Sequence, residues 1–215
     1  MLVLSLDTCL AACQVALVQD GETVAVASEP MTRGHQESLA PMLQAMLAKS
    51  GVSLDTIDRI AVTVGPGSFT GLRVGLAFAK GLSLALGKPA VGVTSLEALA
   101  ASAPAAGLCL ALIDARRDQA YWQGFAEGQP ATPPKASGLA EIVDWAIEAG
   151  PPTMLVGPGS DLLASRFPAA AHRPMAGPDP VVIARLAATR EPRPAAPLYL
   201  RTPDAKLPGG VDPFA

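Results

Sequence analysis

The tetrapeptide Gly-Pro-Gly-Ser occurs twice in this chain, at Gly65–Ser68 and at Gly157–Ser160. Each copy follows a short apolar segment that is typical of a buried strand, Ile60–Val64 and Thr153–Val156. Glycine permits the sharp turn by which a strand leads into a helix. Because the repeat recurs in the same context, it indicates an internal duplication, and the chain is expected to form two similar units.

Both turns lie downstream of an apolar strand that ends in an aspartate. Leu2–Leu6 leads into Asp7 in the first unit, and Leu108–Ile113 leads into Asp114 in the second. In the first unit a hairpin, a helix and further elements follow in the order β-β-β-α-β-α, and the second unit starts on the same plan. This order, used twice, is the plan of the actin-like ATPase and sugar-kinase (ribonuclease H-like) fold. We therefore predict an α/β protein with two lobes, each built on a mixed sheet.

We place the lobe boundaries where the plan restarts and where proline becomes frequent. Residues 1–103 are expected to form an N-terminal lobe, residues 104–190 a C-terminal lobe, and residues 191–215 a Pro-rich segment that is partly mobile. The apolar spacing predicts helices at Ser38–Ala48, Phe69–Leu86, Leu96–Ala101, Leu139–Ala149 and Pro180–Ala188.

The segment Phe69–Leu86 contains a stripe of small residues. Gly71, Gly75 and Ala79 are spaced at i, i+4 and i+8, so they lie on one side of the predicted helix, where another backbone can approach closely. The stripe fits packing against the chain's own sheet, and it equally fits docking of a helix from a partner chain. The sequence leaves both interpretations open.

The glycine turn at Gly65–Ser68 also has the form of a phosphate-binding site, because a strand feeds a helix N-terminus through it. No Gly-Lys-Ser/Thr follows at the spacing of a Walker loop, and a dinucleotide fingerprint belongs after the first strand of its unit. A tight connection between packed elements explains the glycines as well as a ligand does.

Composition limits the partners and the compartment. The formal charge of -3 argues against a chain that grips nucleic acid unaided. The N-terminus lacks the basic and cleavable parts of a signal peptide, and Arg73 and Lys80 interrupt the most apolar segment. An odd number of cysteines without a framework pattern points to reduced thiols. We expect a cytoplasmic protein with no membrane role.

Five segments, spread over nearly the whole chain, resemble the TsaB family, which takes part in making threonylcarbamoyladenosine in bacterial tRNA. They are Leu4–Thr8, His35–Pro41, Gly65–Gly75, Asp114–Tyr121 and Tyr199–Lys206. The resemblance implies a degenerate, non-catalytic relative of the catalytic subunit TsaD. It implies pairing with TsaD, with the ATPase TsaE joining the pair, and only indirect contact with tRNA, on the adenosine next to the anticodon.

The resemblance places the TsaD interface on helices of the N-terminal lobe, and it allows a homodimer through a related helical face. The residues expected there are Leu39, Met42, Leu43, Gly71, Val74, Gly75, Phe78 and Ala79. On this interpretation Gly75→Leu is expected to leave the monomer folded and to block pairing, because the new side chain fills the groove in which the backbone of the partner sits.

Asp7 and Asp114 are the candidates for a vestigial nucleotide cleft, since carboxylate oxygens suit Mg²⁺ and such aspartates face a nucleotide in the actin-like fold. The simpler explanation is that both residues end strands and cap turns. Weak or vestigial binding of ATP or ADP with magnesium is the only cofactor binding that we expect.

Candidate catalytic and metal residues are few. TsaD relatives hold a metal with two histidines four residues apart on a helix, whereas His35 has Leu39 at that position. His35 is expected to serve as a cap or a surface contact, and Cys9 and Cys13 lack convincing further ligands. We predict no metal site, no catalytic residue and no activity of the chain alone. The alternatives are an active ATP-dependent phosphotransferase or kinase of the same fold, which Asp7→Ala would inactivate, and a peptidase, for which no nucleophile–base pair is identifiable.

Overall fold

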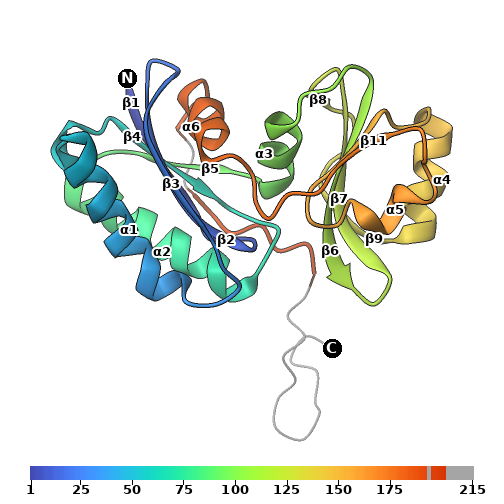
Figure 1. Ribbon diagram of the computed structural model, residues 1–215, viewed down its shortest axis with the longest axis horizontal. Coiled ribbons are helices and arrows are strands. Elements are labelled where there is room, and N and C mark those ends of the chain that lie inside the picture. The colour runs from blue at the N-terminus through green and yellow to red at the C-terminus, as the bar shows by residue number, and fades with distance from the viewer. Residues whose placement is uncertain (193–194, 202–215) are drawn as a thin grey trace, which may run out of the picture.

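The computed structural model describes residues 1–192 and 195–201, which form two lobes side by side (Figure 1). The first lobe contains a sheet with the strand order β3-β2-β1-β4-β5. The second contains a sheet with the order β11-β10-β6-β7-β8, in which β9 also pairs with β7. Both sheets mix parallel and antiparallel pairs. The predicted fold class, a two-lobed α/β fold of the actin-like plan, is confirmed.

The first sheet is organised around its central strand. Its strands are β1 (Leu2–Asp7), β2 (Ala12–Gln19), β3 (Glu22–Pro30), β4 (Arg59–Thr63) and β5 (Ala90–Val93). Strand β1 runs antiparallel to β2 and parallel to β4, and all of its residues are buried. Leu4 and Leu6 pack on one face of the sheet and Val3 on the other. This burial on both faces explains why the strand is apolar along its length.

Helices α1 (His35–Ser50) and α2 (Phe69–Leu86) cover one face of the first sheet, and a short 3-10 turn, η1 (Leu54–Thr56), precedes β4. Helix α1 contacts β2 and β3, whereas α2 contacts β4, β1 and β5, so the two helices lie side by side (Figure 1). Helix α6 (Pro180–Ala188) covers the opposite face. The first sheet is therefore enclosed on both sides.

The second lobe repeats the plan with shorter helices on its outer face. Its strands and helices are β6 (Leu108–Arg116), β7 (Gln119–Ala126), β8 (Gln129–Pro130), β9 (Lys135–Gly138), α4 (Leu139–Ala149), β10 (Met154–Val156), α5 (Asp161–Ala164) and β11 (Ala171–Arg173). Trp122 and Leu112 of this sheet pack with Ile142 of α4 and Leu163 of α5. These helices cover the outer face of the second sheet.

The last helix of each unit packs on the sheet of the other unit. Helix α3 (Ser95–Ser102) follows β5 in the chain but contacts β6 and β7, whereas α6 follows β11 but contacts β1, β2 and β4. We expected residues 104–190 to form the C-terminal lobe, and this does not hold for α6. The reason is that its apolar side, with Ile183 and Ala187, packs against the first sheet.

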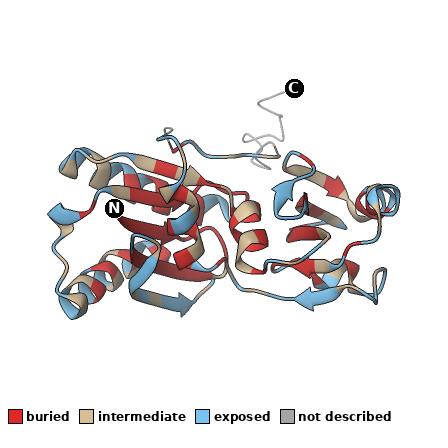
Figure 2. Cartoon of the chain, turned by 90° about the horizontal axis from the view of Figure 1, so that it is seen from above, coloured by how far each residue is buried: buried red, intermediate tan, exposed pale blue. Residues whose placement is uncertain are grey.

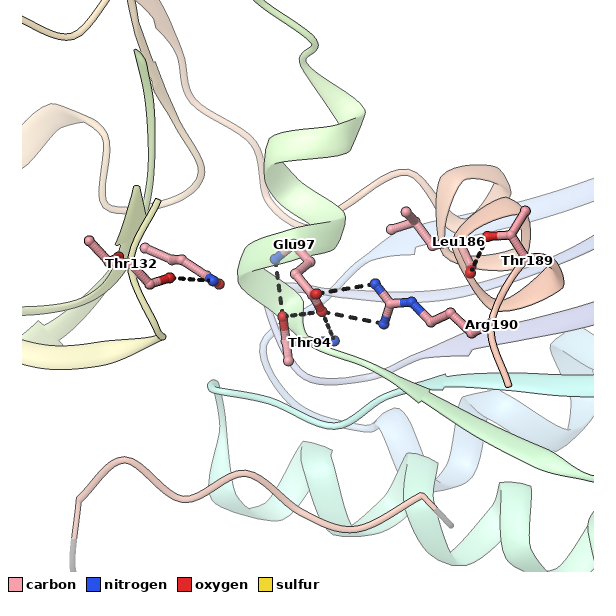
Figure 3. Close-up of polar contacts among 7 residues, drawn as sticks. Thr94, Glu97, Thr132, Leu186, Thr189 and Arg190 are labelled. Atoms are coloured by element: carbon pink, nitrogen blue, oxygen red, sulfur yellow. Dashed lines mark hydrogen bonds and ion pairs between the residues drawn. The ribbon is translucent and has the colours of Figure 1, made fainter. Parts of the chain in front are cut away.

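Polar and apolar contacts tie the exchanged helices together. Arg190, which follows α6, donates from Nη2 to Glu97 Oε1 of α3 at 3.1 Å, and Thr94 and Glu97 form the capping box of α3 (Figure 3). Leu96 and Leu99 of α3 belong to the same apolar cluster as Leu4 of the first sheet and Phe125 of the second. Figure 2 shows this buried helix between the buried strands of the two lobes. The core is thus continuous across the lobes.

Residues Ala195–Arg201, which we call the strap, run back across the molecule. The backbone N–H of Leu198 donates to the carbonyl oxygen of Val64 at 2.7 Å, and Arg201 Nη1 donates to the carbonyl oxygen of Ala115 at 2.6 Å. Residues 191–215 were expected to be partly mobile, and of these 193–194 and 202–215 lie outside the described residues. The same holds for the end of the fifth family segment, Tyr199–Lys206.

Candidate functional site

The residues predicted for a partner interface lie on helices α1 and α2. Helix α2 begins after Ser68, whose hydroxyl accepts a hydrogen bond from the N–H of Gly71 at 3.2 Å, and it ends at Gly87, with φ 65°. Leu72 and Leu76 of α2 are buried against the sheet. The exposed apolar residues of α2 are Phe69, Ala77, Leu84 and Ala85, and Leu84 is 86% exposed.

The glycine stripe faces inward. A Cβ atom on Gly71 would lie 2.0 Å from the carbonyl oxygen of Thr8, and one on Gly75 would lie 2.6 Å from Thr8 Oγ1. The Thr8 hydroxyl also donates to the carbonyl oxygen of Gly71 at 2.6 Å. Gly71, Gly75 and Ala79 are buried, so they seat α2 on the first sheet and the turn after β1 and do not form an exposed partner surface.

This geometry also corrects the expectation for Gly75→Leu. A leucine at that position would meet Thr8 and Val62 within the monomer. The substitution is therefore expected to disturb the fold itself, because a well-packed contact leaves no room for four additional carbon atoms.

The other residues predicted for the interface divide into two groups. Leu39 and Leu43 of α1 are buried in the core of the first lobe. Met42, Val74 and Phe78 are half-buried, pack on that core and keep part of their surface in solvent. Of the eight predicted interface residues, these three are the ones that a partner can reach in this conformation.

A groove of about 510 Å³ lies between the two helices. It is lined by Gln36, Leu39, Phe69, Thr70, Arg73, Val74, Ala77 and Phe78. The Arg73 guanidinium lies 3.5 Å from the centroid of the Phe69 ring, in cation–π geometry. The groove offers an apolar floor and a cationic edge, which together suit a partner protein better than a small polar ligand.

Helix α2 is more apolar than its burial in the monomer requires. By length and composition alone it could cross a membrane, yet only 28% of its residues are buried within the structure. A surface helix of a globular protein normally has a polar outer face. Sequence reasoning missed Phe69, Ala77 and Leu84 because it followed the glycine stripe. The signal that could have found them is the apolar character of the side opposite the glycines.

Asp7 lies inside the first lobe and is fully buried. Its Oδ1 accepts hydrogen bonds from Thr63 Oγ1 at 2.6 Å and from the N–H of Cys9 at 3.0 Å. Its Oδ2 accepts from Gln14 Nε2 at 3.3 Å, and Gly177 closes over the same oxygen. Burial raises the pKa of the Asp7 carboxyl above its ordinary range, against the smaller opposing effect of these hydrogen bonds.

The surroundings of Asp7 do not fit a magnesium–nucleotide site. Both carboxylate oxygens already accept hydrogen bonds from the chain, and the side chain has no exposed surface for water or phosphate. Asp114 differs, because its side chain is 39% exposed, and it accepts a hydrogen bond from the N–H of Arg116 at 2.7 Å. The two aspartates thus occupy equivalent positions in their units but not equivalent environments.

His35 is buried and does not cap α1. It is the first residue of the helix, where Gly34 provides no side-chain cap, and its Nε2 lies 3.2 Å from the carbonyl oxygen of Leu10. In the part of the chain that the structure describes, no three His, Cys, Asp or Glu side chains are grouped to hold a metal ion. Burial also raises the pKa of the Cys9 thiol to about 12, so Cys9 is poorly suited to act as a nucleophile.

Comparison with known proteins relates the chain to proteins of threonylcarbamoyladenosine biosynthesis in tRNA. The family model described as TsaD, tRNA N6-adenosine threonylcarbamoyltransferase, matches residues 22–166. The Escherichia coli K12 tRNA threonylcarbamoyladenosine biosynthesis protein TsaB is 43% identical over 128 residues, which cover 58% of this chain and 55% of that protein.

Two further relatives match nearly the full length. An uncharacterized protein of Mycobacterium tuberculosis H37Rv is 33% identical over 207 residues, which cover 95% of this chain and 93% of that protein. Among solved structures, YeaZ from Pseudomonas aeruginosa superposes with a TM-score of 0.75 at 30% identity, covering 93% of this chain and 99% of that one.

Proposed function

The chain belongs to the TsaB family and has a role in the biosynthesis of threonylcarbamoyladenosine in tRNA, and from this premise we propose that it is a non-catalytic subunit that binds and activates TsaD. The docking face is the outer surface of α1 and α2, with Phe69, Val74, Ala77 and Phe78 at its centre. Catalysis then belongs to the partner, and this chain supplies the surface that holds the partner in its active form.

One observation carries the proposal: α2 is apolar around much of its circumference but is mostly uncovered in the monomer. Exposed apolar surface of this kind marks an interaction site. Arg73 and Phe69 at the edge of the groove are residue types that supply much of the binding energy at protein interfaces.

The family relation argues for TsaD as the occupant. The TsaD family model spans α1 and α2 of this chain, so a TsaD subunit brings a related pair of helices. Two related helix pairs can pack face to face about an approximate two-fold axis, as the interfaces of symmetric dimers do. A second copy of this chain is the competing occupant, and a homodimer would use the same face.

The proposed lack of catalysis has its own support. An actin-like phosphotransferase requires a carboxylate that reaches a magnesium–nucleotide complex. Asp7 is enclosed, and both of its carboxylate oxygens accept hydrogen bonds within the chain. The surroundings of Asp7 therefore do not support the kinase alternative. We further propose a cytoplasmic complex in which TsaE joins the pair and tRNA binds mainly through the partners, in keeping with the net charge of -3.

Reconstitution tests the proposed role. Purified TsaD, TsaE, threonylcarbamoyl-AMP and tRNA are mixed with or without this chain, and modified adenosine is quantified. We expect modification to depend on the chain, although the chain alone modifies nothing. Modification at full rate in its absence contradicts the role, and modification by the isolated chain contradicts the lack of catalysis.

A matched pair of surface variants tests the docking face. Ala77→Arg places a long cation in the groove at an exposed position, so we expect it to weaken TsaD binding about a hundredfold without unfolding the chain. Ile147→Arg on α4 is the control, because Ile147 is 64% exposed on a helix of the second lobe that does not line the groove. Calorimetry measures the affinity of each variant for TsaD. Sedimentation of the chain alone measures whether it forms a homodimer. Equal TsaD affinity of the two variants contradicts the assignment.

A further inference from the structure

The strap, Ala195–Arg201, connects the proposed docking face to the second lobe. Ala195 is buried next to Gly92 of β5, and Leu198 donates its N–H to Val64 just beyond the end of β4. Arg201 then reaches the carbonyl oxygen of Ala115 near the end of β6. The strap thus crosses the carboxyl ends of strands from both sheets, the edge at which open α/β sheets usually bind ligands.

Tyr199 joins the strap to helix α2. Its ring centroid lies 5.7 Å from that of Phe69, and its hydroxyl accepts a hydrogen bond from Arg73 Nε at 3.2 Å. The same Arg73 guanidinium covers the other aromatic ring, that of Phe69. Phe69 and Arg73 line the groove between α1 and α2, and Tyr199 is 44% exposed beside them. The three side chains form one cluster that continues the groove onto the strap.

We propose that the strap, through Tyr199, is part of the docking surface and, through Arg201, couples the binding of TsaD to the position of the second lobe. This inference rests on the proposed function, because TsaD is the occupant. A partner seated in the groove contacts Phe69, Arg73 and Tyr199 together. The partner therefore restricts the motion of the strap at Tyr199. The hydrogen bond from Arg201 transmits this restriction to Ala115 in the second lobe.

The chemistry of the cluster favours a direct role in binding. Tyr, Phe and Arg are large side chains that contribute strongly when an interface removes them from water. Exposed as a preformed cluster, they lose little conformational freedom on binding. Leu198 is held by its backbone hydrogen bond and by partial burial in the core, so movement of Tyr199 cannot be absorbed locally and passes along the strap.

Two kinds of variants separate binding from coupling in the full chain. Tyr199→Ala removes the ring from the cluster, and we expect the dissociation constant for purified TsaD to rise about tenfold. Tyr199→Phe keeps the ring and loses only the hydroxyl, so a rise of about two- to threefold is expected. Arg201→Ala leaves the groove intact and breaks the contact to Ala115. We expect its affinity to stay within about twofold of the parent chain.

Hydrogen exchange measured by mass spectrometry reads out the coupling. In the parent chain, TsaD binding is expected to slow exchange in the peptide that contains Asp114–Arg116, which belongs to the second lobe and does not line the groove. In Arg201→Ala this protection is expected to be lost although TsaD still binds. Thermal unfolding of the free variants confirms that each one is folded.

The outcomes distinguish the two proposals. If the parent chain does not bind TsaD, the proposed function fails, and the coupling fails with it. If the parent chain binds TsaD but Tyr199→Ala binds equally well, the strap is not part of the docking surface. If protection at Asp114–Arg116 is absent in the parent complex or persists in Arg201→Ala, the coupling is overturned and the docking face stands.

Discussion

The two Gly-Pro-Gly-Ser turns perform the same packing task and lead to different structures. In the first lobe Gly67 packs against the carbonyl oxygen of Cys9, and in the second Gly159 packs against the backbone at Asp114. Gly65 and Gly157 both adopt positive φ values, 93° and 105°. The first turn opens the 18-residue helix α2, whereas the second opens α5, which has four residues. Both lobes have the turn, and only the first lobe has the long helix that carries the proposed docking face.

The aspartates before these turns show the same divergence. Asp7 is enclosed by Thr63, Gln14 and Gly177, whereas Asp114 remains at the surface beside Arg116. A position inherited from one plan has thus become a buried structural group in one lobe and an exposed turn residue in the other. The comparison teaches that equivalent sequence positions predict equivalent backbones but not equivalent chemistry.

The largest expected effect concerns the contact between α2 and Thr8. Gly71→Ala places a methyl group against a backbone oxygen, so we expect the free energy of unfolding to fall by about 3 kcal/mol or more. Gly81→Ala is the matched control, because nothing lies within 4 Å of a Cβ there, and a gain of about 0.5–1 kcal/mol is expected. Urea unfolding measures both. Similar values for the two variants would show that α2 is not seated by its glycine stripe.

The turns themselves provide the next comparison. Gly67→Ala brings a Cβ atom to 2.3 Å from the carbonyl oxygen of Cys9, whereas Gly159→Ala brings one to 2.8 Å from the backbone nitrogen of Asp114. We expect losses of about 2–3 and about 1–2 kcal/mol in the free energy of unfolding. A larger loss for Gly159→Ala contradicts the conclusion that the first turn is the more tightly packed of the two.

The pH dependence of stability sharpens the comparison between the aspartates. Burial raises the pKa of Asp7 above its ordinary value of 3.8, so the folded chain retains this proton at pH values where the unfolded chain has lost it. The free energy of unfolding therefore falls as pH rises from about 3.8 through the folded pKa, by about 1.4 kcal/mol for each unit of the shift.

Asp7→Asn is expected to remove this fall. Asp114→Asn, which replaces the exposed aspartate of the second lobe, is the control variant. Urea unfolding between pH 4 and pH 8 measures the three profiles. The difference between each variant and the parent isolates one carboxyl from the rest of the chain. Parallel profiles for the parent chain and Asp7→Asn would mean that burial does not control this titration.

The smallest effect concerns thiol reactivity. Burial raises the pKa of Cys9 to about 12, mainly by desolvation with Asp7 adding to it, and raises the pKa of Cys109 to about 11. At one pH, Cys109 therefore has about tenfold more thiolate and is expected to react first with iodoacetamide in the folded chain. Labelling in urea, where the two thiols should react alike, is the control. Faster labelling of Cys9 contradicts the expected order.

Much of the backbone was predictable from apolar spacing. The predicted bounds Phe69–Leu86, Leu139–Ala149 and Pro180–Ala188 are those of α2, α4 and α6. Short elements were missed, because segments such as Lys135–Gly138 in β9 and Ala171–Arg173 in β11 have no apolar periodicity and become strands only by pairing with a neighbour.

The candidate site was harder to predict. Close packing of a helix demands small residues whether the neighbour is the chain's own Thr8 or a partner, so the stripe with Gly71 could not reveal its direction. The amphipathic pattern of α6 likewise specifies an apolar face but not the sheet that receives it. The burial of Asp7 depends on Gly177, which is distant in sequence and has no local signal.

The exchange of terminal helices has a consequence for how the chain is made. During translation the first five strands emerge early, but one face of their sheet stays bare until Pro180–Ala188 leaves the ribosome. The nascent chain must therefore hold an apolar surface open across most of its synthesis, the period in which chaperones bind such surfaces. A premature stop codon just before α6 would leave one face of the first sheet uncovered although all strands of that sheet had been made, so the first unit depends on the end of the second.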